Sequence, residues 1–147
     1  MNWDQMRRRC SSARFKFVAK TEGYRLAFTR FSKKWRCGVA DIVASPGSEV
    51  WGPVFAIAND EIDELDKSEG HRPRRHRDEN AYERRQFEVF RQGDNARPIT
   101  VWTYFVVNRL KSSPRPSAEY KATILAGARH WKLPADYVEE LERIETQ

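Results

Sequence analysis

Glu69 is the acidic side chain that the sequence places best for acid–base chemistry. It directly precedes Gly70, a typical helix stop, at the end of a short acidic helical segment. Helix C-termini carry partial negative charge, so a carboxylate there is opposed rather than stabilised. If Glu69 also points into a barrel mouth, desolvation adds to this effect, and both favour its protonated form and suit a general base at neutral pH. The alternative is a surface glutamate paired with His71 or Arg72.

The other reactive residue types do not form a familiar site. The chain has no Gly-x-Ser-x-Gly, no His-Glu-x-x-His and no phosphate-binding loop ending in Gly-Lys-Ser/Thr. His71 and His76 fall in a basic loop and His130 at a helix end, where we expect solvated or capping roles. Cys10 and Cys37 have neither metal-type spacing nor a disulfide framework, so we interpret them as reduced packing residues. No metal site is predicted.

Composition indicates one soluble globular domain over residues 1–147. The chain has 39% hydrophobic and 12% aromatic residues, which argues against disorder across its length. No apolar run approaches the roughly 18 residues of a membrane-spanning helix, and Met1-Asn2-Trp3-Asp4 opens no signal or transit peptide. We therefore expect a cytoplasmic protein that does not bind membranes.

The formal net charge of +6 raises nucleic-acid binding as an alternative, because arginines cluster between Arg72 and Arg85. The same segment contains Asp78, Glu79 and Glu83, as a solvated mixed-charge loop does. No RNA-recognition, KH, helix-turn-helix or zinc-finger pattern accompanies the charge. We therefore expect no nucleic-acid partner.

The elements that must position Glu69 follow from hydrophobic periodicity. Short, partly alternating runs predict four strands over residues 15–18, 24–31, 39–43 and 49–55. Ser45-Pro46-Gly47-Ser48 predicts a hairpin between the last two, and Pro53 an edge or a bulge. Residues 81–90 and 99–108 predict two more strands joined across residues 92–95, and the second, the most apolar stretch, is expected to be central.

Helices are predicted before, between and after these strands. They cover residues 3–10, a segment capped by Asn59 or Asp60 that ends at Gly70, a region from Ser117 to His130, and the amphipathic C-terminus. Asp66 is expected to make local helix-end hydrogen bonds. The pattern predicts an α+β fold with a small, mixed, largely antiparallel β-barrel flanked by short helices. A dinucleotide fold is disfavoured, since no Gly-x-Gly-x-x-Gly occurs.

Several sequence runs, in order, resemble the gamma-glutamylcyclotransferase family. No single run is decisive, and their shared order over nearly the whole chain makes the match specific. The matching runs are residues Arg25–Phe28, Gly38–Ile42, Pro46–Gly52, Leu65–Gly70, Ala81–Arg84, Glu119–Lys121, Gly127–Ala128 and Leu133–Tyr137.

This resemblance implies a barrel enzyme that uses neither a metal nor an organic cofactor. Members convert a gamma-glutamyl amine or amino acid to 5-oxoproline, because the substrate's own α-amine attacks its γ-carbonyl. The position that matches the family's proton-transferring glutamate is Glu69. By the same match Tyr82 and Tyr120 would line the pocket, with the Tyr120 hydroxyl near the small-molecule substrate. The alternative for either tyrosine is barrel packing.

The resemblance departs at the front of the chain. Family members begin with an apolar strand that leads into Tyr-Gly-Ser-Asn, whose backbone N–H groups hold the glutamyl moiety. Here Met1-Asn2-Trp3-Asp4 looks like the residues just after that motif, so we expect the true start to lie upstream of Met1. If the motif is lost instead, the alternative function is a non-catalytic small-molecule or protein-binding domain on the same scaffold. Neither the leaving group nor the oligomeric state follows from the sequence.

Overall fold

The computed structural model describes residues 2–147, and Met1 lies outside the described residues. Within these residues the structure has four helices and four long strands, and the strands form one antiparallel sheet, which confirms the predicted α+β class. Their order is α1 (Trp3–Arg9), β1 (Arg14–Ser32), β2 (Cys37–Ala56), the 3₁₀ turn η1 (Asn59–Glu61), α2 (Ile62–Glu69), η2 (Arg77–Glu79), β3 (Tyr82–Arg91), β4 (Pro98–Val106), α3 (Ala118–His130) and α4 (Ala135–Glu142).

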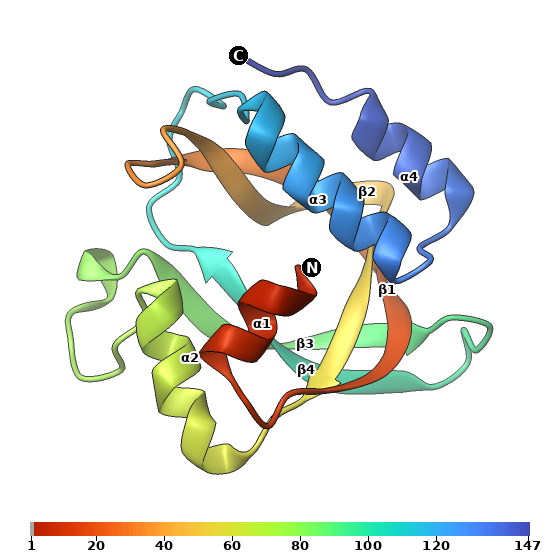
Figure 1. Cartoon of the computed structure of the whole chain (residues 1–147), viewed down its shortest axis with the longest axis horizontal. Helices are drawn as coiled ribbons and strands as arrows, with labels where there is room; N and C mark the ends of the chain where they lie inside the picture. Colours follow the sequence, from red (N-terminus) through yellow and green to blue (C-terminus); the bar gives the residue numbers. More distant parts are fainter. Residues whose placement is uncertain (1) are drawn as a thin grey trace.

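The strands form one antiparallel sheet in the order β2-β1-β3-β4. β1 and β2 pair along almost their full length, whereas β1 meets β3 only where Ala19 and Lys20 face Arg91 and Phe90. Within residues 2–147 no backbone ladder joins β2 to β4, so the sheet curls without closing. Figure 1 shows α3 and α4 lying together over the β1–β2 ribbon, α2 at the opposite edge of the view, and α1 between α2 and α3. The predicted barrel is therefore a loose one.

The first four predicted strands are in fact two long ones. The predicted hairpin at Pro46-Gly47 is wrong, because β2 continues through it. Tyr24 faces Ala44 and Glu22 faces Glu49, so residues 45–48 are extra residues in β2 opposite a short stretch of β1. The left-handed backbone of Gly47 (φ 81°) makes a bulge rather than a reversal, since β1 continues alongside and keeps β2 paired. Pro53 lies on the edge strand β2, as expected.

β4 is not the central strand that its apolar sequence predicts, because it ends the sheet. Phe105 and Val106 are buried, but Trp102 is 55% exposed, with the Arg84 guanidinium over its ring. Tyr104 packs against a small cluster formed by α1 and α2. β4 is therefore an apolar edge strand whose side chains are covered from two directions, since Phe105 packs on Tyr24 of β1 and Phe87 of β3. Strand periodicity does not encode these contacts.

Two hydrophobic clusters hold the helices on the sheet. The larger one joins α3 and α4 to β1, and the smaller one joins the end of α1 to α2. Cys10 and Cys37 are both buried and free, which confirms their predicted packing role. The buried members of the larger cluster are Val18, Ile124, Ala128, Leu133, Tyr137 and Leu141.

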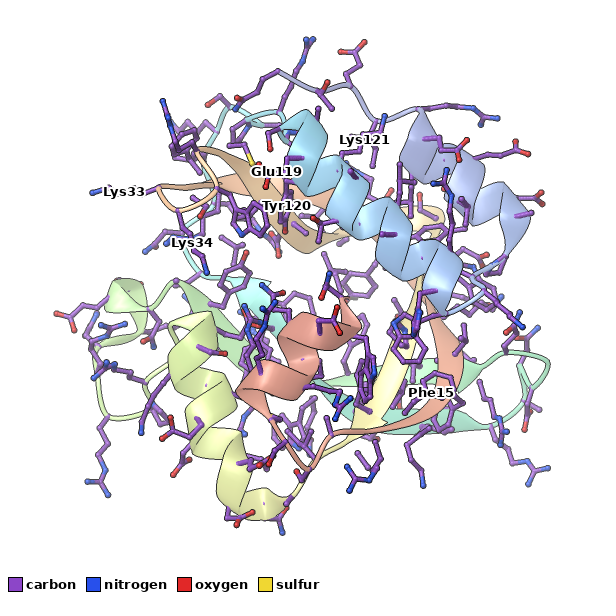
Figure 2. The ribbon with its side chains drawn as sticks, in the orientation of Figure 1. Phe15, Lys33, Lys34, Glu119, Tyr120 and Lys121 are labelled. Atoms are coloured by element: carbon purple, nitrogen blue, oxygen red, sulfur yellow. The ribbon has the colours of Figure 1, made fainter. Side chains whose placement is uncertain are left out.

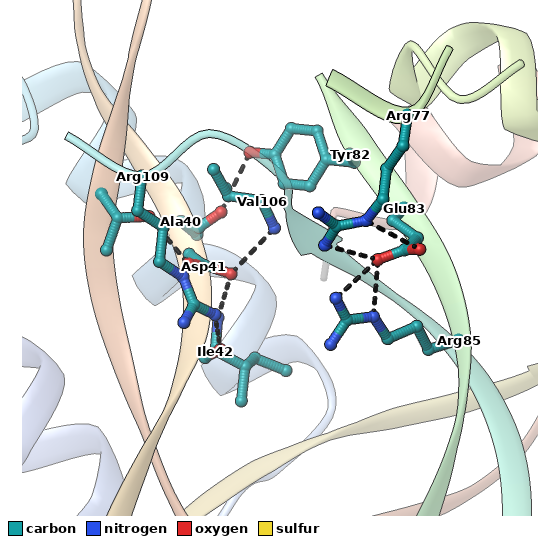
Figure 3. Close-up of polar contacts among 10 residues, drawn as sticks. Ala40, Asp41, Ile42, Arg77, Tyr82, Glu83, Arg85, Val106 and Arg109 are labelled. Carbon is teal, nitrogen blue, oxygen red and sulfur yellow. Dashed lines mark hydrogen bonds and ion pairs between the residues drawn. The ribbon is translucent and has the colours of Figure 1, made fainter. Parts of the chain in front are cut away.

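Asp41 of β2 bridges the part of the barrel that no backbone ladder closes. Its side chain is fully buried, and Oδ1 accepts hydrogen bonds from the backbone N–H groups of Ile42 (2.8 Å) and Val106 (3.1 Å). Oδ2 accepts from the Thr29 hydroxyl (2.7 Å) and from Nε of Arg109 (2.7 Å). Figure 3 shows the carboxylate reaching from β2 to the end of β4. A buried carboxylate is tolerated here because each of its oxygens accepts hydrogen bonds from two donors.

We expect Asp41→Ala to destabilise the fold by about 3–5 kcal/mol, because it leaves the Arg109 charge and the Val106 N–H without their acceptor. Urea unfolding measures this free energy. Asp94→Ala is the matched control, since Asp94 pairs with an Arg97 side chain that is 88% exposed, and its loss is expected to stay within about 0.5 kcal/mol. Equal losses in the two variants would contradict the bridging role.

Candidate active site

The end of α2 fixes Glu69 against the start of β3. The helix stops at Gly70, which adopts a left-handed conformation (φ 72°), as the sequence predicts. The Gly70 carbonyl accepts the N–H of Ala81 at 3.1 Å, and a Cβ on Gly70 would lie 2.8 Å from the Cβ of Ala81. Glycine is therefore required both by its backbone and by close packing. Tyr82 follows Ala81 at once, so this junction brings Glu69 and Tyr82 together.

Tyr82 and Tyr120 meet on one residue of β2. The Tyr82 hydroxyl donates to the carbonyl of Ala40 at 3.0 Å, and the Tyr120 hydroxyl accepts the Ala40 N–H at 3.2 Å. Figure 3 shows Tyr82 reaching Ala40, next to Asp41. Figure 2 shows Tyr120 between α3 and the β1–β2 hairpin, where its ring also packs on Trp35 with centroids 5.0 Å apart. The structure thus brings both predicted tyrosines to the same place.

Glu69 belongs to the same neighbourhood. Burial is the main cause that raises the pKa of Tyr82 and of Tyr120, and the negative charge of Glu69 adds to the rise at both. Both phenols therefore stay neutral over the ordinary pH range. The three residues predicted from the sequence come from α2, β3 and α3, and Glu69 lies close enough for its charge to act on both phenols.

Arg9, which the sequence reasoning did not single out, is the ion-pair partner of Glu69. Nη1 of Arg9 lies 2.5 Å from Oε1 of Glu69, and the two side chains are 28% and 23% exposed. The predicted alternative partners, His71 and Arg72, do not take this position. No local pattern could have found the pair, because 60 residues separate its members. Nothing in the sequence distinguishes Arg9 from the adjacent Arg7 and Arg8.

Asp66 supports the site through long-range contacts, so the predicted local role of its side chain is wrong. It is 2% exposed, and its Oδ1 accepts the Tyr104 hydroxyl at 2.6 Å and lies 3.6 Å from Nε of Arg84. Burial raises the pKa of Tyr104, and the bond to Asp66 raises it further. One carboxylate therefore ties α2 to β3 and β4, one turn before Glu69.

The basic segment between α2 and β3 is held by hydrogen bonds and ion pairs within the segment and with the start of β3. The side-chain oxygen of buried Asn80 accepts the Arg72 N–H at 3.0 Å and Nη2 of Arg75, also at 3.0 Å. Glu83 pairs with Arg77 and Arg85 (Figure 3). These contacts match the mixed-charge interpretation of the segment.

Glu61 holds α1, and with it Arg9, against α2. The expected caps Asn59 and Asp60 make no side-chain cap bond. Instead the Glu61 carboxylate accepts the hydroxyls of Ser11 (2.7 Å) and Ser12 (2.6 Å) together with both of their backbone N–H groups. The Ser12 hydroxyl bond is the largest of the causes that lower the pKa of Glu61 to about 2. The link joins the turn after α1 to the start of α2.

Residues 2–147 have neither a cluster of metal-ligating side chains nor a membrane-spanning helix. No group of three or more His, Cys, Asp and Glu side chains in this range could hold a metal ion. No helix in it is long and apolar enough to cross a membrane. The arrangement at the end of α2 therefore offers a carboxylate, a guanidinium and two neutral phenols, which suits proton transfer and the binding of a charged small molecule.

Comparison with known proteins agrees with this fold. A solved structure named gamma-glutamyl cyclotransferase superimposes with a TM-score of 0.86 at 31% identity, covering 98% of this chain and 82% of that one. The mouse gamma-glutamylcyclotransferase is 36% identical over 139 residues, and the human protein of the same name is 34% identical over 138. Each alignment covers 91% of this chain and 68% of the relative.

These matches define the class of protein as a gamma-glutamylcyclotransferase-like enzyme. The AIG2-like family description matches residues 49–141, which include α2, β3 and α3. The chain belongs to this AIG2-like, gamma-glutamylcyclotransferase family. The resemblance predicted from the ordered sequence runs is thereby confirmed.

Gly70→Ala is expected to lose more stability than Gly93→Ala. Both residues have positive φ (72° and 85°), so both variants should lose about 1–2 kcal/mol from the left-handed backbone. Only at Gly70 does the added Cβ meet another atom, at 2.8 Å from Ala81, whereas nothing lies within 4 Å at Gly93. Urea unfolding measures both losses, and equal values would show that close packing at Ala81 does not restrict the end of α2.

The contribution of Glu61 to stability is expected to depend on pH. Because folding lowers its pKa from an ordinary 4.5 to about 2, the contribution is complete above pH 4.5 and disappears as the pH falls toward 2. The difference in unfolding free energy between the unsubstituted chain and Glu61→Gln should therefore be largest near pH 7 and should disappear near pH 2. Urea unfolding at several pH values measures it. Glu88→Gln is the control, because Glu88 is exposed. If the loss of stability in Glu61→Gln stays constant with pH, the ionised Glu61 carboxylate does not hold the Ser11-Ser12 turn.

Proposed function

We propose that this chain converts a gamma-glutamyl amine or amino acid into 5-oxoproline and the free amine, with Glu69 as the general acid and base. The observation that carries the proposal is that Tyr82 and Tyr120 meet at Ala40, with Glu69 near enough for its charge to act on both hydroxyls. We also propose that residues 1–147 act as one domain with a small-molecule substrate.

The reaction needs only proton transfer and positioning. Glu69 takes a proton from the substrate's α-ammonium, and the freed amine attacks the γ-carbonyl carbon to form the new C–N bond of the ring. The bond from this carbon to the leaving nitrogen then breaks as Glu69 returns its proton to that nitrogen. The ring nitrogen loses its second proton, which passes to the released amine or to water, and 5-oxoproline is left with a neutral amide N–H. Nothing is oxidised or reduced, so we propose no cofactor. Because both reacting groups belong to one molecule, holding the substrate in a folded shape supplies much of the acceleration.

The two tyrosines differ in what their hydroxyl protons can do. Tyr82 uses its proton in the bond to the Ala40 carbonyl. Tyr120 accepts the Ala40 N–H through its oxygen, so its own proton is left to donate. We therefore assign Tyr82 to the pocket wall and Tyr120 to a hydrogen bond with the substrate oxygen on which negative charge develops.

Glu69→Gln is expected to lower 5-oxoproline release by roughly 10²–10⁴-fold, because the amide cannot carry the proton. The assay follows 5-oxoproline from several gamma-glutamyl compounds. Glu64→Gln is the matched control on the same helix, since Glu64 is 63% exposed and pairs only locally with Lys67, and it should retain full activity. Equal rates for Glu69→Gln and the unsubstituted chain would overturn the assignment of Glu69.

A binding domain without turnover is the second candidate, and the Arg9–Glu69 ion pair favours it because Arg9 already holds a carboxylate oxygen of the proposed base. This candidate predicts that the unsubstituted chain binds gamma-glutamyl compounds in a calorimetric titration without releasing 5-oxoproline. Release that depends on Glu69 would exclude it.

A further inference from the structure

The Arg9–Glu69 ion pair places a positive and a negative side chain side by side, where a ligand with both charges could contact them. Arg9 ends α1, and its Nη1 lies 2.5 Å from the Glu69 carboxylate. Both side chains are partly exposed, so a solute can reach them. This bond occupies one guanidinium N–H, and within residues 2–147 no other hydrogen bond from the Arg9 side chain accompanies it. The remaining donors of its planar fork are available to a ligand.

The charges of the pair also act on the proposed substrate-facing tyrosine. Burial is the main cause that raises the pKa of Tyr120, the negative charge of Glu69 raises it further, and the positive charge of Arg9 lowers it. Arg9 therefore belongs to the same group of side chains as Glu69 and Tyr120, although it comes from the other end of the chain.

The position of Arg9 is fixed before any ligand arrives. The next residue, Cys10, is buried in the cluster with Ala13 and Leu65. Glu61 then holds the following Ser11-Ser12 turn through its carboxylate. A guanidinium anchored in this way loses little freedom on binding, which favours its use in recognition.

We propose that Arg9 and Glu69 together bind the α-amino-acid head of the substrate, with Glu69 on its α-ammonium and Arg9 on its α-carboxylate. This inference rests on the proposed function for the contact between Glu69 and the ammonium. The two groups of the substrate sit on one carbon, and the two protein groups sit in direct contact. Binding exchanges one ion pair for two and leaves no charge unpaired. Arg9 thereby selects gamma-glutamyl compounds whose α-carboxylate is free.

The test uses two analogues of one gamma-glutamyl amide, each lacking one charge. The desamino analogue, a glutaramate, keeps the carboxylate and cannot cyclise, and the descarboxy analogue, a 4-aminobutanamide, keeps the ammonium. We expect Arg9→Gln to weaken binding of the desamino analogue by roughly tenfold or more. The same variant should leave binding of the descarboxy analogue unchanged or tighter, because Glu69 no longer has a competing cation. NMR titration measures both dissociation constants and shows any cyclised product as separate signals.

Arg8→Gln is the matched control, since Arg8 is the exposed neighbour on the same helix and should change neither constant. A merely structural role of Arg9 would weaken both analogues alike, and that result would overturn the proposal. Failure of the unsubstituted chain to bind the desamino analogue would also overturn it. Because this analogue cannot react, its binding is measured whether or not the chain releases 5-oxoproline, so failure of the proposed function is recognised separately.

Discussion

The buried carboxylate of Asp41 is the interaction on which the rest of the structure depends. It joins β1, β2 and the end of β4 at the place where the sheet does not close by backbone pairing. The next residue back along β2 is Ala40, whose N–H and C=O hold the two tyrosines of the candidate site. The same short stretch of β2 therefore closes the barrel and sets the positions of Tyr82 and Tyr120.

The site itself is made of side chains that sequence distance keeps apart. Gly70 fixes where α2 ends, and its hydrogen bond to Ala81 places Glu69 next to the start of β3. Asp66 and Glu61, on the same segment, anchor it to β4 and to the turn after α1. Three of the carboxylates in and just before this short helix thus have separate partners: Glu61 binds the Ser11-Ser12 turn, Asp66 binds Tyr104, and Glu69 pairs with Arg9.

The sequence predicted the features that local chemistry determines, and it failed where distant chain segments decide. The helix stop at Gly70, the two buried cysteines and the C-terminal helices follow from turn chemistry and periodicity. Pro46-Gly47 has the same local signal in a hairpin and in a bulge, and only the continuing partner strand distinguishes them. Ordered family-like runs pointed to Glu69, Tyr82 and Tyr120, whereas Arg9 has no signal of its own because its partner lies 60 residues away.

The long β1–β2 hairpin also orders the steps of folding. Its strands are joined by residues 33–36, so their pairing closes a short loop at small entropic cost. Tyr120 meets Ala40 across 80 residues of sequence, and that contact has to wait until α3 docks on a hairpin that already exists. We therefore expect the hairpin to form early and the candidate site to be among the last parts to become ordered. If α3 detaches locally, the fraction of molecules with an assembled site falls before the sheet itself unfolds.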